Sequence, residues 1–236
     1  MRRCGVLLIS IFSIAAGILP AYAGTDSTAK PPADPNSFRL FLAPTSKTIP
    51  GNKGSIQLAE LSVPCINYGI IDELEIRGGI APFTIDGHLL YFGMAGLEIF
   101  NYNGFSGVGG LALTSMTGSG RNWESSFYGF GVVGYSNNYF GIHGGFGGGY
   151  SGKRESNSAI IMLGATYALS AHNSIVTENW IIPESGTEAV SIGLRIFGKV
   201  ISGDFGIIAI TKEHTLDFQT VAPWVSLSYH FDTSEE

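Results

Sequence analysis

Two stretches of the sequence have the glycine spacing of dinucleotide-binding loops. They contain Gly129, Gly131 and Gly134, and Gly147, Gly149 and Gly152. Such a loop binds pyrophosphate only where it follows a strand and opens a helix, because the N–H groups at the helix start donate to the phosphate oxygens. Neither stretch opens a helix, and no strand, helix, strand unit follows. The sequence therefore predicts no nucleotide-binding site.

Histidines and serines could supply a metal site or a nucleophile. The histidines are His88, His143, His172, His214 and His230. The sequence has no HExxH or CxxC motif and no closely spaced pair of histidines, and no GxSxG motif. We therefore predict no metal, no cofactor and no catalytic residue. Scattered serines still leave open a barrel-embedded hydrolase at an outer rim, where the fold would bring together a nucleophile, a histidine and an orienting group.

Charged side chains within the apolar segments form a third candidate site. If the segments are strands of a closed barrel, alternation places these residues inside: Arg39, Glu60, Glu75, Arg77, Glu98, Glu178, Arg195 and Asp204. An inward position is expected because Arg or Lys facing lipid costs about 2 to 4 kcal/mol near the bilayer midplane. We expect Glu178 and Arg195 to face each other across a hairpin and to pair. Such a network either neutralises itself or makes a pore selective.

The elements that position these residues are expected to be β-strands. Apolar and glycine-rich segments alternate with short polar breaks. A helix is excluded over Gly141 to Gly149, since each glycine costs about 1 kcal/mol relative to alanine in a helix. We predict about twelve strands, over residues 37–43, 54–68, 73–82, 88–100, 105–117, 123–135, 139–151, 158–169, 173–183, 188–198, 202–211 and 218–231.

Alternation within the strands indicates two faces in different solvents. Val221, Val225 and Leu227 share one face of the last segment, whereas Trp224, Ser226 and Ser228 share the other. Only 14% of residues are charged, and no apolar run after the first residues approaches the ~20 residues of a spanning helix. These features predict an all-β fold, a closed antiparallel up-and-down transmembrane β-barrel. The faces of segment 123–135 stay undecided, because the length of the turn at Asn137 sets them.

The breaks between strands alternate in character. Breaks near Ile70, Asn103, Asn137, Ser170 and Lys199 are tight, whereas those between them are more polar and looser. This asymmetry is typical of an outer-membrane barrel, with periplasmic turns and external loops. An even strand count places both ends of the barrel on the periplasmic side. Trp123 and Trp180 near the looser ends, and Tyr229 and Phe231 near the tight ends, would form interfacial aromatic girdles.

The two ends of the chain are expected to lie outside the barrel. Residues 1–23 read as a secretory signal peptide, with two arginines, an apolar run and cleavage between Ala23 and Gly24. Residues 24–36 contain three prolines and are expected to be a disordered leader. The barrel would span 37–231, and 232–236 would be a C-terminal tail. A retained membrane anchor is the alternative to cleavage.

Several stretches resemble a known family, the uncharacterised outer-membrane β-barrel proteins of Gram-negative bacteria. They are FRLFLAPTSKTIPGNKG, NYGIIDELEIRGGI, IVTENWIIP, VSIGLRIFG and PWVSLSYHF. The resemblance implies a barrel in the outer membrane and no particular activity. The closing stretch is similar to the assembly signal of outer-membrane proteins, here Tyr229 and Phe231. The chain departs from that signal by continuing with DTSEE, so recognition of a free terminal aromatic is in doubt.

The expected function is passive, either structural or as a narrow pore for small solutes. A barrel of about twelve strands lies between small filled barrels and large water-filled porins, and inward Leu90, Phe92, Met94, Phe197 and Trp224 would narrow it. The expected partners are outer-membrane lipid and the outer-membrane assembly machinery. No basic stripe suggests nucleic acid. The alternatives are the embedded hydrolase and a soluble secreted β-sandwich that acts as a binding protein.

Overall fold

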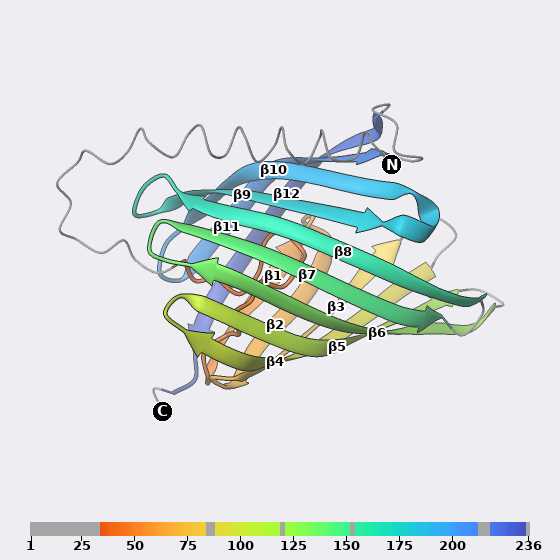
Figure 1. The fold of residues 1–236 in the computed structure, drawn as a ribbon, viewed down its shortest axis with the longest axis horizontal. Helices are drawn as coiled ribbons and strands as arrows, with labels where there is room; N and C mark the ends of the chain where they lie inside the picture. The colour runs from red at the N-terminus through yellow and green to blue at the C-terminus, as the bar shows by residue number, and fades with distance from the viewer. Residues whose placement is uncertain (1–33, 84–87, 119–120, 152–153, 212–217, 235–236) are drawn as a thin grey trace.

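The protein is a closed antiparallel β-barrel of twelve strands (Figure 1). The computed structural model describes residues 34–83, 88–118, 121–151, 154–211 and 218–234. The predicted signal peptide, the cleavage site at Ala23 and Gly24 and most of the predicted leader lie outside the described residues. The fold class and the strand number predicted from the sequence are confirmed.

The strands follow one another around the barrel in chain order. They are β1 Lys53–Ala59, β2 Val63–Ile71, β3 Leu74–Phe83, β4 His88–Tyr102, β5 Phe105–Gly118, β6 Arg121–Ser136, β7 Phe140–Ser151, β8 Arg154–Ala168, β9 Asn173–Ile182, β10 Thr187–Phe197, β11 Ile201–Thr211 and β12 Phe218–Asp232. A short 3-10 helix, Pro183–Ser185, joins β9 to β10. β1 pairs with β12 from Lys53 with Asp232 to Ala59 with Ser226, so the described strands leave no free sheet edge. None of the described segments is a helix able to cross a membrane.

The first two predicted strands differ from the observed ones. Segment 37–43 is not a strand, since it lies inside the barrel with residues 34–36, which therefore do not belong to a disordered leader. Segment 54–68 is two strands, because Glu60 and Leu61 adopt positive φ angles of 49° and 53° and make a tight turn. No glycine or asparagine marks a hairpin turn at these positions. The two errors cancel, so the strand number is still twelve.

The barrel has a turn end and a loop end. The turn end carries the β2–β3, β4–β5, β6–β7, β8–β9 and β10–β11 connections, at the left in Figure 1. Asn103 and Gly104 join β4 to β5 with φ angles of 51° and 85°, as a type I′ turn requires. Asn137 accepts hydrogen bonds from the N–H groups of Tyr139 and Phe140 at the β6–β7 turn. The tight breaks of the sequence therefore all lie at one end.

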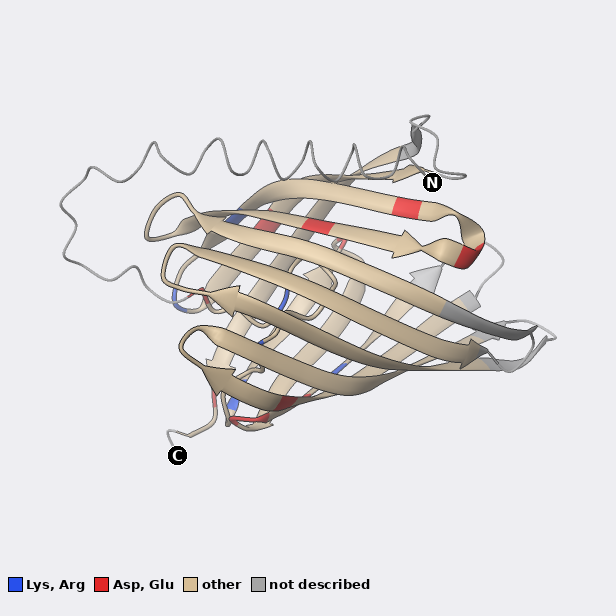
Figure 2. Cartoon of the chain, viewed as in Figure 1, with Lys and Arg blue, Asp and Glu red and all other residues tan. Residues whose placement is uncertain are grey.

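The outer face of the barrel is apolar, as alternation requires. Leu111 is 71% exposed, Phe146 63% and Val221 61%, whereas inward residues of the same strands, such as Val108, His143 and Trp224, are buried. Charged residues are few along the strands (Figure 2). Apolar side chains that ring a sheet without edges match the lipid-facing band of a transmembrane barrel. A soluble sandwich would bury such a face, so the structure does not support that alternative.

Aromatic residues gather on the outer face at the turn end. Tyr68 stacks on Phe231 with ring centroids 6.4 Å apart, and Phe105 lies 4.9 Å from Tyr135. Tyr229 is 53% exposed on the same band. This arrangement matches an interfacial girdle. Trp180 does not belong to a girdle, since it packs against the core inside the barrel.

The undecided faces of β6 are now assigned. Phe127 and Val133 point outward, whereas Tyr128, Phe130 and Val132 point inward. The opposing inward positions of β7 are glycines, and a Cβ at Gly149 would lie 2.2 Å from the Tyr128 ring. Glycine on one strand thus makes room for aromatic rings of the next.

Candidate functional site

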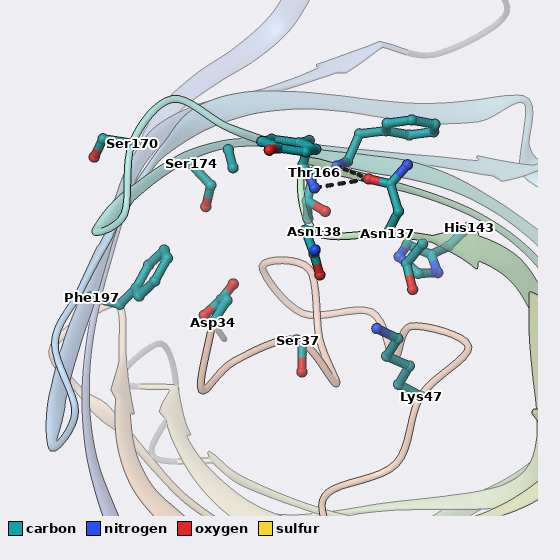
Figure 3. Close-up of a pocket in the computed structure, with 14 residues that line it drawn as sticks. Asp34, Ser37, Lys47, Asn137, Asn138, His143, Thr166, Ser170, Ser174 and Phe197 are labelled. Atoms are coloured by element: carbon teal, nitrogen blue, oxygen red, sulfur yellow. Dashed lines mark hydrogen bonds between the residues drawn. The ribbon is translucent and has the colours of Figure 1, made fainter. Parts of the chain in front are cut away.

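A segment of the chain before β1 folds back into the barrel and fills part of its lumen. This lumen segment, residues 34–50, makes a compact turn in which Leu40 donates its N–H to Ala43 and Thr45 donates to Phe38, at 2.9 Å each. Leu40 is fully buried and Phe41 is 1% exposed. In Figure 3 the segment loops through the interior beside the strands of the wall. The lumen is therefore occupied rather than open at this level.

Apolar residues of the lumen segment pack against the inner wall. Leu40, Phe41 and Ala43 form one cluster with residues of β6, β8, β9 and β12: Val132, Met162, Val176 and Trp224. The rings of Phe41 and Trp224 lie 6.1 Å apart. Gly164 of β8 lies directly beneath Leu40, where a Cβ would come within 2.0 Å of Leu40 Cδ1. The short apolar run that resembles a strand in the sequence is therefore a buried core.

A cluster of two arginines and two carboxylates fixes the start of the lumen segment. Arg195 of β10 donates to Asp204 of β11 at 2.6 Å, and Arg39 donates to the other oxygen of Asp204 at 2.7 Å. Arg195 also donates to Asp34 at 3.0 Å. All but Asp34 are almost fully buried. Since buried charges are tolerated only when they are paired and hydrogen-bonded, the segment and the wall depend on each other here.

Backbone groups of the lumen segment are bound by charged side chains of the wall. Glu178 of β9 accepts the N–H groups of Phe41, Leu42 and Ala43 at 2.8, 2.9 and 3.0 Å. Arg195 donates to the carbonyl oxygens of Asn36, Arg39 and Leu40. A loop inside a barrel must satisfy its polar backbone groups, and these two residues do so.

A second charged pair, on β3, binds the same segment from the other side of the barrel. Arg77 and Glu75 form an ion pair at 2.5 Å. Arg77 also donates to the carbonyl of Phe38 at 2.9 Å and lies over its ring, 4.7 Å from the centroid. Glu75 accepts the N–H of Ile49 at 3.0 Å. The lumen segment is thus attached to both sides of the barrel.

Of the eight charged residues predicted to point into the barrel, six gather around the lumen segment and two do not. The six are Arg39, Glu75, Arg77, Glu178, Arg195 and Asp204. Glu60 was predicted to point inward but lies in the exposed β1–β2 turn, where it accepts the N–H of Val225. Glu98 lies near the turn end, half-buried beside Asn101. The other described members of the site, Asp34, Asn36, Ser46 and His143, were missed because no periodicity marks a residue that binds a non-strand segment.

The predicted pair of Glu178 and Arg195 is wrong. β9 and β10 are neighbours, but Glu178 is opposite Ser191 and Arg195 is opposite Ser174. The two charges are therefore offset along the strands. Each binds the lumen segment instead, and Arg195 takes Asp204, directly opposite on β11, as its partner.

Two serine–histidine contacts occur in the lumen. Ser46 Oγ lies 3.1 Å from His143 Nδ1, and Ser202 Oγ lies 2.8 Å from His230 Nε2. Both serines are 2% exposed or less, so neither hydroxyl can reach a substrate at an outer rim. The contacts connect the lumen segment and neighbouring strands to one another. They do not support the embedded hydrolase. Within the described ranges, no group of His, Cys, Asp and Glu residues could hold a metal ion.

A pocket of about 280 Å³ remains between the lumen segment and the wall at the turn end (Figure 3). Asp34, Ser37 and Lys47 line it from the segment. The β6–β7 turn, β7, β8, β9 and β10 contribute the remaining described residues: Ser136, Asn137, Asn138, Tyr139, Phe140, His143, Thr166, Ala168, Ser170, Ser174 and Phe197. Its described lining combines polar and apolar side chains and includes one lysine.

Comparison with solved structures identifies the fold. The chain is similar to the KdgM porin, with a TM-score of 0.57 and 8% sequence identity over 76% of this chain and 98% of that one. The same porin in complex with disordered oligogalacturonate gives a TM-score of 0.57 at 9% identity, with the same coverage. An anion-selective porin from Comamonas acidovorans gives only 0.40 at 13% identity, over 72% of this chain and 59% of that one. No protein-family model and no curated protein sequence matches the chain.

Proposed function

We propose that the protein is an integral outer-membrane barrel that serves as a narrow, passive pore for small solutes, and that the lumen segment closes it. The observation that carries the proposal is the lumen segment itself, which fills a closed barrel whose outside is apolar. An ion pair connects it to β11, and hydrogen bonds connect it to β3, β9 and β10. The described conformation is the closed one, and solutes pass when the segment moves.

The shape of the barrel supports a membrane location. Its apolar band and its aromatic residues at the turn end match the two regions that a bilayer requires, and its fold is shared with a porin. The turn end would face the periplasm and the loop end the exterior. Lipid of the outer membrane surrounds the barrel, and Tyr229 and Phe231 at the end of β12 are the residues that the assembly machinery would recognise.

The attachment of the lumen segment makes gating testable by a reversible cross-link. Ser46 Oγ of the segment and Ser106 Oγ of β5 lie 2.7 Å apart, so cysteines at both positions can form a disulfide. The variant Ser46→Cys, Ser106→Cys is made in a Cys65→Ser background. Its conductance is measured in planar bilayers before and after reduction. We expect small, brief openings when it is reduced and none when it is oxidised, because the disulfide holds the segment in place.

Deletion of residues 34–50 removes the lumen segment and should leave the pore permanently open. The deleted barrel should conduct steadily, because the lumen is no longer filled. The Cys65→Ser protein alone is the matched control and should respond to neither oxidant nor reductant. If the reduced variant, the control and the deleted barrel all leave the bilayer as insulating as before, the protein is not a pore. A purely structural role in the outer membrane would then be the remaining form of the passive function.

A further inference from the structure

The pocket between the lumen segment and the wall has apolar lining from Phe140, Ala168 and Phe197, and several side-chain hydrogen-bond donors beside it. Lys47 extends toward Asn138 across this space (Figure 3). Asn137 uses its side-chain oxygen to accept two backbone N–H groups, so its amide nitrogen is left to donate. Ser37, Thr166 and Ser170 add hydroxyl groups.

His143 also presents a donor. Its Nδ1 accepts the backbone N–H of Ser46 at 3.3 Å, and this nitrogen must therefore be unprotonated. The proton of a neutral imidazole then lies on Nε2. Nε2 lies toward Gly141 and Thr166, since a Cβ at Gly141 would be 2.9 Å from Nε2 and 3.0 Å from Thr166 Oγ1. Thr166 itself lines the pocket.

Negative charge in the pocket is already neutralised. Asp34 is the carboxylate among its described lining residues. One oxygen of Asp34 accepts the N–H of Asn36 at 2.8 Å, and the other is paired with Arg195 at 3.0 Å. By contrast, none of the carboxylates in the described residues is within ion-pair distance of the Lys47 ammonium. The local balance therefore favours a negative ligand.

Two hydroxyl groups of the pocket are buried without a partner. Ser174 is 5% exposed, and neither its Oγ nor that of Ser136 has a hydrogen-bond partner in the described structure. Both residues line the pocket. A buried hydroxyl without a partner is costly and uncommon in folded proteins. A polar ligand in the pocket would give both groups a partner after rotation of their side chains.

We propose that this pocket binds a small carboxylate that also carries hydroxyl groups. The carboxylate binds Lys47 and the Nε2–H of His143, and the ligand hydroxyls bind Ser136, Ser174 and the asparagine amides. The site lies at the turn end, between the lumen segment and β6–β10, so its ligand would enter from that side. Binding requires the closed conformation and does not depend on whether the barrel conducts.

The test compares gluconate with sorbitol, which has the same number of carbons and is similarly hydroxylated but is uncharged. Binding to the full chain in detergent micelles is measured by titration calorimetry. We expect gluconate to bind about tenfold or more tightly than sorbitol, because a hydrogen bond to a charged group is stronger than a neutral one. Equal affinities for the two compounds would overturn the proposal.

Variants locate the binding site. Lys47→Met should weaken gluconate binding about tenfold or more, whereas Lys199→Met, at an exposed lysine of the nearby β10–β11 turn, should leave it unchanged. Ser174→Ala should weaken binding several-fold without destabilising the barrel, since its hydroxyl has no protein partner. The shift in gel mobility on boiling reports that each variant is folded. Gluconate binding that Lys47→Met leaves intact in a folded barrel would exclude this pocket.

Discussion

At the scale of single residues, Glu178 shows how one carboxylate can hold a whole segment. It accepts three consecutive backbone N–H groups and the indole N–H of Trp180. Hydrogen bonds to a charged group contribute about 1.5 to 3 kcal/mol each. The geometry resembles a small anion site built from backbone amides, except that the anion belongs to the wall and the amides to the lumen segment.

Glu178→Gln should therefore loosen the lumen segment but leave the ring of twelve strands intact. The amide keeps one acceptor oxygen but loses the charge, and its NH₂ group would meet either Trp180 or the backbone donors. We expect the amides of Phe41, Leu42 and Ala43 to lose about 2 kcal/mol of protection, measured by hydrogen exchange in micelles.

Glu98→Gln is the matched control for this change. Within the described structure, the Glu98 side chain accepts a long hydrogen bond of 3.4 Å from Asn101 and none from the amides of Phe41, Leu42 and Ala43, so exchange at these amides should be unaltered. Equal protection in the Glu178→Gln and unmodified proteins would show that the charge of Glu178 does not hold the segment.

At the scale of elements, β6 and β7 are built as complementary surfaces. β7 has glycine at its inward positions 145, 147 and 149, opposite the inward side chains of β6. At Gly149, a Cβ would meet the Tyr128 ring at 2.2 Å and the carbonyl of Phe127 at 2.4 Å. Gly144 points outward, and a Cβ there would have only an ordinary contact of 3.6 Å with Leu163.

Gly149→Val should destabilise the barrel, whereas Gly144→Val should not. The inward valine overpacks the interior, which costs about 1 to 3 kcal/mol, while an outward valine suits a strand facing lipid. The measurement is the urea midpoint of unfolding in micelles. Similar midpoints for the two variants would contradict the assigned faces of β7.

The strands could be predicted because each is a long element with a period of two. In β10, the outward Ile192 and inward Arg195 follow directly from alternation. The turn at Glu60 and Leu61 could not be predicted, since residues that rarely adopt positive φ were forced to do so by the pairing of β1 with β2. The lumen segment could not be predicted either. Its run Leu40 to Ala43 is apolar whether it meets lipid or the core, and only the closed wall around it decides between the two.

At the scale of the whole molecule, the apolar exterior makes the protein dependent on a bilayer. Ile192 is 53% exposed on β10, and Val200 is 46% exposed in the turn that follows. Ile192→Arg should lower folding stability in lipid vesicles by about 2 to 4 kcal/mol if it lies near the midplane. Val200→Arg should change it little, because a turn lies in the interfacial or aqueous region.

Stability is measured by urea titration of the protein folded into vesicles. The mobility shift on boiling reports the fraction that forms a closed barrel. Should both arginines be tolerated equally, the outer face of β10 would not contact hydrocarbon. The proposed carboxylate site and the proposed closed pore would then belong to a barrel that is not embedded in a membrane.

The lumen segment has one further consequence, for the order of assembly. Both of its described ends lie at the turn end, where Asp34 and Lys47 line the same pocket and Asn52 leads directly into β1. A segment whose two described ends lie at the same opening need not be threaded through the ring of strands. The barrel can therefore close first by pairing of β1 with β12. The lumen segment can dock afterwards, as a late folding step with its own time constant.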